Sequence, residues 1–268
     1  MGLEQRTFPS TAAARSKPAA ELADYITKAV RRARLVERPF LHLALEGLFP
    51  PEVYKNLLAA MPSTGYRGMS GRSKVARRDD GTPTRVKIDL FPEYIRQFPK
   101  ADRALWQHVG RVLRSAALEQ AFVERLAPGL TRRFGAERDR QRYYAIPILT
   151  RDTPGYSIAP HTDTKWKGIT VQLYLPPDSS ITHVGTVFHE RLADGTLKRV
   201  TQIPFAPNSG YAFAVGDDTW HSADVVGPEV RSRDSILLTY FVDTGALRFT
   251  RNRLKRTANL VRSEFHRE

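Results

Sequence analysis

Cysteine does not occur in this 268-residue chain. Its absence excludes disulfide bonds, thiolate metal sites, iron–sulfur clusters and cysteine nucleophiles. Long hydrophobic runs are also missing, because no stretch approaches the roughly 18 consecutive apolar residues that a membrane span requires. The N-terminal segment holds charges and prolines but lacks the apolar centre of a secretory signal. We therefore expect a cytoplasmic protein without a membrane partner.

Acidic residues are scarce relative to basic ones, 28 against 42, which gives a formal net charge of +14. The whole excess lies in residues 1–36, 66–87 and 248–268. A basic chain invites a nucleic-acid interpretation. Here the excess falls in a leading segment, a loop and a tail, with few aromatic residues for base stacking. The pattern therefore argues against nucleic acid, and favours a small anionic substrate or an acidic carrier protein where a charged partner exists.

The front half of the chain has the periodicity of helices. Apolar residues recur at helical spacing from Ala19 to Arg34. A second helix is expected to open at Pro50-Pro51-Glu52, since proline is tolerated in a first turn. More helix is expected at about 101–126, broken near Gly110 and ended by Pro128-Gly129. Residues 64–84 between these helices contain four glycines and are expected to form a long loop.

From Arg142 onward the chain changes to short β-rich runs separated by turn residues. These runs cover residues 143–149, 168–175, 185–188, 199–203, 210–215 and 235–241. Several short strands at this spacing are typical of an antiparallel sandwich or jelly roll. We therefore predict an α+β fold in a single domain, 1–268. Its parts are a helical support at about 17–135, a jelly-roll catalytic core at about 140–245 and a basic tail at 246–268.

Two histidines and one aspartate form the candidate chemical centre. His161 and Asp163 make a His-x-Asp triplet, and His221 follows 58 residues beyond Asp163. Two imidazoles and one carboxylate on one face of a metal ion leave the other face open, as non-haem Fe(II) requires. Arg233 and Ser235 begin the last predicted strand, 12 residues after His221. An arginine beside such a site suits a dicarboxylate, because guanidinium pairs bidentately with carboxylate.

The stretch from about Arg142 to Asp243 resembles the Fe(II)- and 2-oxoglutarate-dependent dioxygenases, in the prolyl-4-hydroxylase-like branch. The resemblance covers somewhat over a third of the chain, and the preceding helices match no motif. It implies a double-stranded β-helix, the jelly roll of this family. The motifs that carry it are Gly155–Asp163, Ile169–Pro176, Gly185-Thr186-Val187-Phe188, Pro207-Asn208-Ser209-Gly210, Trp220-His221-Ser222 and Arg233-Asp234-Ser235.

The resemblance implies a role for each of these site residues. His161, Asp163 and His221 are expected to hold Fe(II) and to form the catalytic centre. Arg233 is expected to bind the distal carboxylate of the cosubstrate 2-oxoglutarate, with Ser235 assisting. The third cofactor that the resemblance implies is O₂.

Two of the expected cosubstrate contacts, those of the arginine and of Tyr174, rest on further observations. Where the family commonly places the binding arginine, Arg231 stands here, 10 residues after His221. The serine after Arg233 and the strand pattern favour Arg233 instead. Tyr174 stands where some members have a cosubstrate-binding tyrosine. Strand alternation puts it on one face with Thr170 and Gln172, which we expect to line the pocket.

The implied reaction is hydroxylation of a C–H bond in a small polar or anionic substrate such as an amino acid, free or carrier-bound, with release of succinate and CO₂. Asp163 favours hydroxylation over halogenation, because related halogenases have glycine or alanine there. Desaturation, cyclisation or epimerisation on the same iron site stays open. The alternatives are a nucleic-acid oxygenase or binding module and a catalytically silent jelly roll. Thr239 opposes the former, since dealkylating members carry a second arginine at that position.

Overall fold

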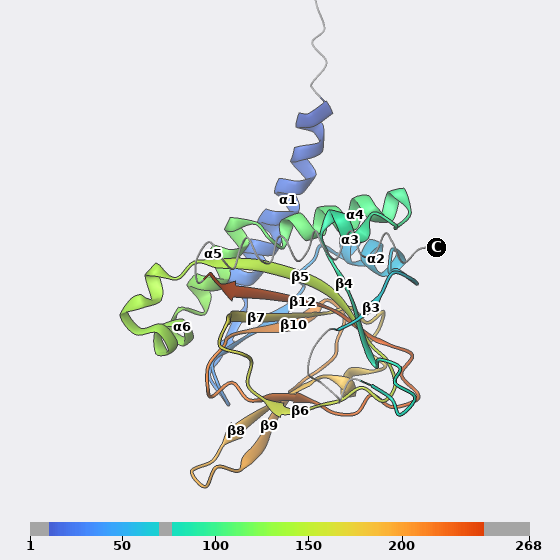
Figure 1. The fold of residues 1–268 in the computed structure, drawn as a ribbon. Coiled ribbons are helices and arrows are strands. Elements are labelled where there is room, and N and C mark those ends of the chain that lie inside the picture. The colour runs from blue at the N-terminus through green and yellow to red at the C-terminus, as the bar shows by residue number, and fades with distance from the viewer. Residues whose placement is uncertain (1–10, 70–76, 244–268) are drawn as a thin grey trace, which may run out of the picture.

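Two antiparallel sheets lie beneath a layer of helices (Figure 1). The computed structural model describes residues 11–69 and 77–243, with side chains from residue 20 onward. The predicted basic tail at 246–268 and residues 70–76 of the glycine-rich loop lie outside the described residues. The predicted α+β class with antiparallel sheets is confirmed for the described part of the chain.

The larger sheet has eight strands in the order β1-β2-β10-β7-β12-β5-β4-β3. The smaller has four, in the order β6-β11-β8-β9. The strands are β1 Arg34–Val36, β2 His42–Glu46, β3 Arg67–Gly68, β4 Arg85–Asp89, β5 Tyr143–Asp152, β6 Ile158–His161, β7 Lys167–Tyr174, β8 Thr186–Arg191, β9 Leu197–Ile203, β10 Ser209–Ala214, β11 His221–Ala223 and β12 Arg233–Val242. All six predicted β runs are strands, with small differences at their ends.

The helices cover the outer face of the larger sheet (Figure 1). They are α1 Thr11–Arg32, α2 Pro51–Ala59, α3 Pro92–Ile95, α4 Lys100–Val112, α5 Ala116–Arg125 and α6 Ala127–Phe134, with 3₁₀ turns at Gly135–Arg140 and Thr182–Val184. Among the described residues, none of these helices has the length and apolar character needed to cross a bilayer.

The predicted helix break near Gly110 was wrong. Gly110 lies inside α4, at a close approach where an added Cβ would stand 2.5 Å from the Leu90 carbonyl oxygen. The break comes instead before Ser115, whose side chain caps α5. The predicted helix end at about 126 is confirmed, since α5 ends at Arg125. Another helix follows at once, however, and Pro128 occupies the first turn of this α6, where its missing N–H costs nothing.

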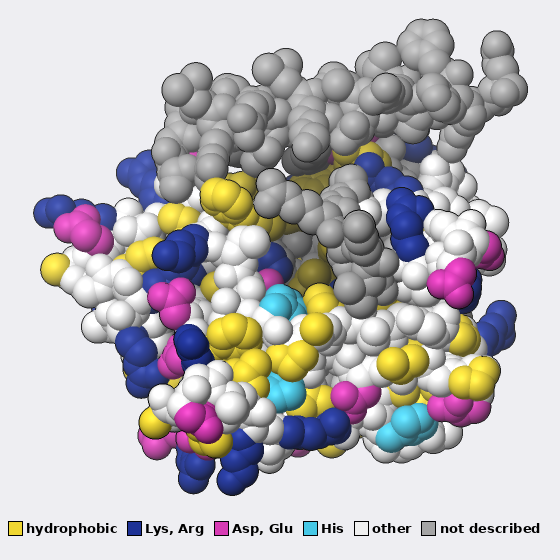
Figure 2. Space-filling model, turned by 60° about the horizontal axis from the view of Figure 1, so that its bottom comes forward, with side chains coloured by type: hydrophobic (Ala, Val, Ile, Leu, Met, Phe, Trp, Pro, Cys, Tyr) yellow, Lys and Arg dark blue, Asp and Glu magenta, His cyan; other side chains and the backbone are white. Residues whose placement is uncertain are grey.

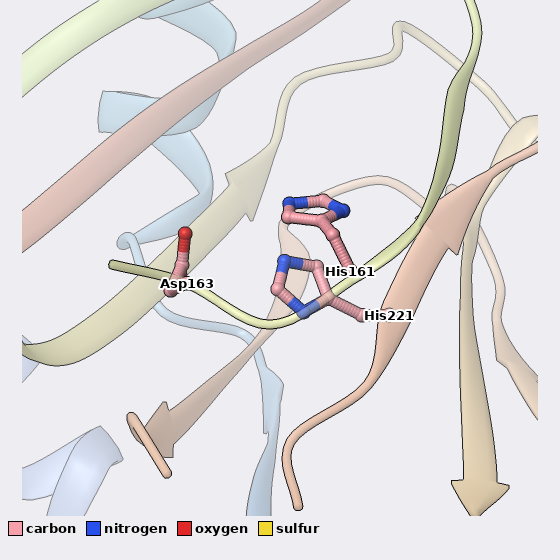
Figure 3. A group of neighbouring side chains, drawn as sticks. All are labelled: His161, Asp163 and His221. Carbon is pink, nitrogen blue, oxygen red and sulfur yellow. The ribbon is translucent and has the colours of Figure 1, made fainter. Parts of the chain in front are cut away.

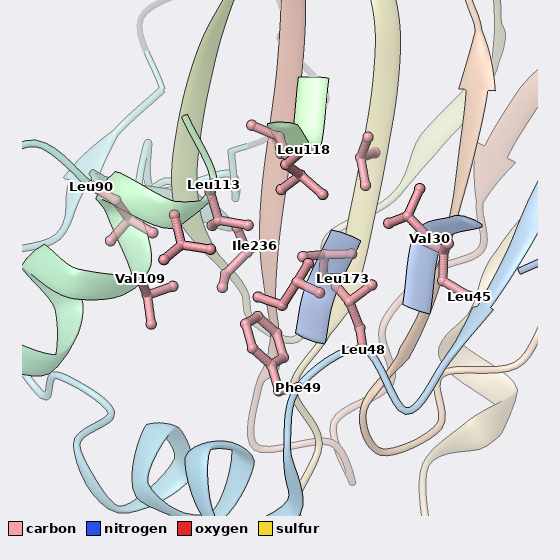
Figure 4. Close-up of a cluster of buried hydrophobic side chains, with 14 of the residues drawn as sticks. Val30, Leu45, Leu48, Phe49, Leu90, Val109, Leu113, Leu118, Leu173 and Ile236 are labelled. Carbon is pink, nitrogen blue, oxygen red and sulfur yellow. The ribbon is translucent and has the colours of Figure 1, made fainter. Parts of the chain in front are cut away.

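Hydrophobic side chains fill the space between the helices and the larger sheet (Figure 4). Val30 of α1, Leu113 and Leu118 pack there against Leu173 and Ile236 of the sheet. Because side chains alternate along a strand, the other face of β7 and β12 looks toward the smaller sheet. That inner face carries the polar residues on which the site depends.

The predicted helical support at about 17–135 also contains four strands, β1 to β4, which were not predicted. Strand β2 pairs with β10, and β4 pairs with β5, so four strands from the front half extend the larger sheet. The helical support and the β core are therefore joined by backbone hydrogen bonds as well as by packing.

Replacing Gly185 by alanine is expected to destabilise the fold. The residue precedes β8, and an added Cβ would lie 1.8 Å from the carbonyl oxygen of Ile203 on the neighbouring strand. The strands would have to separate, which costs about 1–3 kcal/mol of unfolding free energy. Urea unfolding measures the loss. Gly68→Ala is the control, because its nearest neighbour, Pro83, is 3.8 Å away; equal stability of the two variants would contradict the prediction.

Candidate functional site

The two predicted histidines lie side by side on adjacent strands of the smaller sheet. His161 ends β6 and His221 begins β11, and the two residues are directly paired in the register of these strands. Their ring centroids lie 4.3 Å apart. Asp163 follows β6, and one ligand atom from each of the three residues lies within 4.8 Å of the others. Figure 3 shows the three side chains gathered around one space.

Each imidazole is oriented by a backbone carbonyl two residues before it. His161 Nδ1 lies 3.0 Å from the Ala159 carbonyl oxygen, and His221 Nδ1 lies 2.9 Å from that of Thr219. Since a carbonyl oxygen can only accept, each Nδ1 carries the proton and donates it. In the neutral ring each Nε2 therefore keeps a free lone pair, the state in which histidine binds a metal ion.

Asp163 is held in its charged form by its neighbours. Its Oδ1 accepts from Lys167 Nζ at 2.5 Å, and its Oδ2 accepts from Thr170 Oγ1 at 2.6 Å. Burial raises the pKa of this carboxyl, but the charges of Lys167 and His221 and the two hydrogen bonds outweigh it, bringing the pKa to about 2. Burial lowers the pKa of His221 to about 4. At neutral pH both groups are thus in the protonation states that metal binding needs.

A cavity of about 190 Å³ runs from these three residues into the space between the sheets. Figure 2 shows histidine and hydrophobic side chains beside a hollow on this face of the molecule. Arg233 lines the cavity and is only 1% exposed, whereas Arg231 is exposed at the surface. Arg233 donates from Nε to the Val184 carbonyl at 2.6 Å and from Nη2 to Thr186 Oγ1 at 3.1 Å. Of the two candidate arginines, the structure therefore places Arg233 on the cavity.

Thr170 and Gln172 line the cavity, as strand alternation predicts. Ser235 and Tyr174 are buried but lie behind its wall. Ser235 Oγ is 2.8 Å from Thr150 Oγ1 and accepts from Gln172 Nε2 at 2.6 Å. The predicted cosubstrate contacts of Ser235 and Tyr174 stay predictions.

The Tyr174 hydroxyl lies 2.8 Å from Thr186 Oγ1, and its ring centroid is 5.5 Å from the Arg233 guanidinium carbon. Tyr174 therefore contacts the lining residues Thr186 and Arg233, and Ser235 contacts the lining residue Gln172.

Several cavity residues were not predicted from the sequence. Tyr211 of β10 and Tyr156 contribute to the lining, and Lys167 lines the cavity and donates to Asp163. The sequence could have indicated Tyr211, because side-chain alternation along the predicted strand 210–215 places Tyr211 and Phe213 on the same face. For Tyr156, which stands in a turn, no periodic signal was present.

A second, larger cavity of about 480 Å³ also meets Asp163. Its apolar lining includes Phe40, Leu41 and Phe134, and its charged lining includes Arg132 and Lys165. Asp217 and Asp218 add acidic groups. This cavity therefore offers both an apolar floor and charges of both signs next to the candidate metal ligand.

No protein-family model matches the chain, and no curated protein matches it in sequence. Among solved structures, a prolyl-4-hydroxylase from Pseudomonas putida matches 82% of this chain and 98% of its own, at 14% identity and a TM-score of 0.47. A prolyl hydroxylase from Trichoplax adhaerens, in complex with a hypoxia inducible factor peptide, covers 87% of this chain over 93% of its own length. The identity is 10% and the TM-score is 0.49. An oxidoreductase of the 2OG-Fe(II) oxygenase family from Burkholderia pseudomallei covers 90% of this chain over 95% of its own length. The identity is 12% and the TM-score is 0.47.

The functional conclusion therefore rests on the residues of the site.

Proposed function

We propose that this protein is an Fe(II)- and 2-oxoglutarate-dependent oxygenase that hydroxylates a C–H bond of a small polar or anionic substrate, giving succinate and CO₂. The observation that carries the proposal is that one cavity is lined by both a metal-ligand set and a buried arginine. His161, Asp163 and His221 converge there, and the buried Arg233 lines the same cavity. A ligand with a metal-chelating head and a distal carboxylate matches both groups.

The three donors suit Fe(II) because two neutral imidazoles and a carboxylate leave coordination positions for other ligands. When bound, iron with 2-oxoglutarate and O₂ supplies the oxidising chemistry. The residues of the chain hold and orient these groups. The two Nε2 atoms and the Asp163 carboxylate would hold the ion, and Lys167 and Thr170 fix that carboxylate. Arg233 would orient the distal carboxylate.

The fold we propose for this core is the double-stranded β-helix, in one domain with its helical support. Four core strands, β5, β7, β10 and β12, lie in the larger sheet, and the other four, β6, β8, β9 and β11, lie in the smaller. Consecutive strands therefore cross repeatedly between the sheets, as a jelly roll requires. The pairing of β2 and β4 with core strands supports a single domain.

For the substrate we propose the larger cavity beside Asp163. An apolar floor with charges of both signs suits an amino acid or a similar molecule, free or attached to a carrier. Desaturation or cyclisation would use the same residues, so product analysis decides among these outcomes.

The experiment that tests the proposal measures succinate by mass spectrometry. The protein is incubated with Fe(II), 2-oxoglutarate and a pool of amino acids, and products are searched for the gain of one oxygen atom. We expect succinate to depend on Fe(II) and to fall by at least about 100-fold in His161→Ala, because the metal loses a ligand. Equal succinate from the wild type and His161→Ala with every substrate pool would reject the proposal.

A further inference from the structure

One buried carboxylate binds two arginines that line the cavity. Asp152 ends β5, and in the sheet register it stands opposite Arg85 of β4 on one side and Arg233 of β12 on the other. Arg85 donates to it from Nε at 2.5 Å and from Nη2 at 2.7 Å. Arg233 donates from Nη1 at 2.8 Å. Asp152 itself is fully buried.

The charges of this cluster do not cancel. Two guanidinium groups and one carboxylate leave one positive charge in a buried place, which is costly without a counter-ion. Arg233 and Asp152 alone would form a neutral pair with no net attraction for an anion. Arg85 supplies the extra charge, and one further carboxylate would neutralise the cluster.

Both arginines keep hydrogen-bond donors for such a ligand. A guanidinium group has five N–H donors. In the contacts described above, Arg233 uses one on each nitrogen, which leaves one on Nη1 and one on Nη2. Arg85 uses one on Nε and one on Nη2, which leaves three. Both side chains line the cavity.

Tyr156 gives a second and independent sign of a ligand. Its ring lies under Arg85, with the guanidinium carbon 4.1 Å from the ring centroid, and it also lines the cavity. Its hydroxyl is buried and has no hydrogen-bond partner among the described residues. A buried hydroxyl without a partner is costly, and an oxygen of a bound carboxylate would satisfy it.

We propose that Arg85 is a second binding residue for the distal carboxylate, and that Arg85 and Arg233 form a two-arginine site held together by Asp152 and completed by the Tyr156 hydroxyl. The identification of the ligand as 2-oxoglutarate rests on the proposed function. The inference assigns a binding role to β4, a strand outside the predicted jelly-roll core, and it explains why the core arginine is paired with an aspartate.

The test compares two oxo acids of equal chain length on the Mn(II)-loaded full chain by isothermal titration calorimetry. 2-Oxoglutarate has the distal carboxylate, and 2-oxopentanoate lacks it. In Arg85→Gln we expect the Kd for 2-oxoglutarate to rise about 10- to 100-fold, the effect of losing a charge-assisted hydrogen bond. The Kd for 2-oxopentanoate should stay within about two-fold. A purely structural role of Arg85 would weaken both acids alike, and that result would overturn the inference.

The chain offers a closely matched control. Arg151 of β5 donates to Asp234 from Nε at 2.7 Å and lies 4.6 Å from the Tyr66 ring centroid, so it repeats the Arg–Asp–Tyr arrangement away from the cavity. Arg151→Gln should leave both Kd values unchanged.

A milder variant keeps the inference testable if Arg85→Gln does not fold. Tyr156→Phe removes only the hydroxyl, and it should weaken 2-oxoglutarate about 10-fold and 2-oxopentanoate little. Equal affinity of wild type and Tyr156→Phe for 2-oxoglutarate would then overturn the inference. If Arg233→Gln loses 2-oxoglutarate binding and Arg85→Gln does not, the inference fails and the proposed function stands. If the wild-type chain binds no 2-oxoglutarate, both fail.

Discussion

Replacing Arg233 by glutamine is expected to weaken 2-oxoglutarate binding at least about 100-fold, whereas Arg231→Gln should change it less than about two-fold. Arg233 is buried on the cavity, where its remaining N–H groups can pair with a carboxylate in two hydrogen bonds. Each bond to a charged group contributes about 1.5–3 kcal/mol. Arg231 is exposed and is not among the residues that line the cavity.

Calorimetry on the Mn(II)-loaded protein measures both affinities, and thermal unfolding shows whether each variant is folded. Folding has to be checked because Arg233→Gln leaves Asp152 with Arg85 as its remaining arginine. Arg233→Lys keeps the charge but loses the bidentate geometry, so it should bind better than Arg233→Gln and worse than the wild type. Similar losses at positions 231 and 233 would show that the cosubstrate arginine has been assigned wrongly.

The parts of the fold that follow from local pattern were predictable. The apolar residues of α1 and the alternating runs of β5, β7, β10 and β12 define their elements without help from the rest of the chain. Strands β1 to β4, β6 and β11 were missed because they are five residues long or shorter. The partners of β2 and β4 lie far away in the sequence. A strand of that length is stabilised by its neighbours, which a single sequence does not show.

The candidate site likewise has one part that could be predicted from the sequence and one part that could not. The set His161, Asp163 and His221 could be named because its residue types and order are present in the chain, and the structure brings them together. The cluster around Asp152 could not, because it depends on the register of β5 with two strands. The sequence did single out the segment of Arg85 as basic. It gave no reason to place that side chain within reach of Arg233.

Metal binding should raise the melting temperature of the wild-type protein and leave that of His221→Ala unchanged. A ligand that binds only the folded state at 100 times its Kd stabilises that state by about 2.7 kcal/mol. For a chain of this size the shift is about 5–10 °C. His221→Ala removes one of three donors and should lose the shift, since the remaining two hold the ion far more weakly. Differential scanning fluorimetry with and without Mn(II) measures it.

His189→Ala is the matched control for this prediction. His189 and His221 are each 8% exposed and lie on adjacent strands of the smaller sheet. The ring of His189, however, is directed to Ser222 Oγ, at 2.7 Å from Nε2, and it is not one of the three converging donors. Loss of a buried histidine should lower the melting temperature of both variants, but only His189→Ala should keep the Mn(II)-dependent rise. A rise retained in His221→Ala, or lost in both variants, would place the metal elsewhere, because the two histidines differ in their direction and not in their burial.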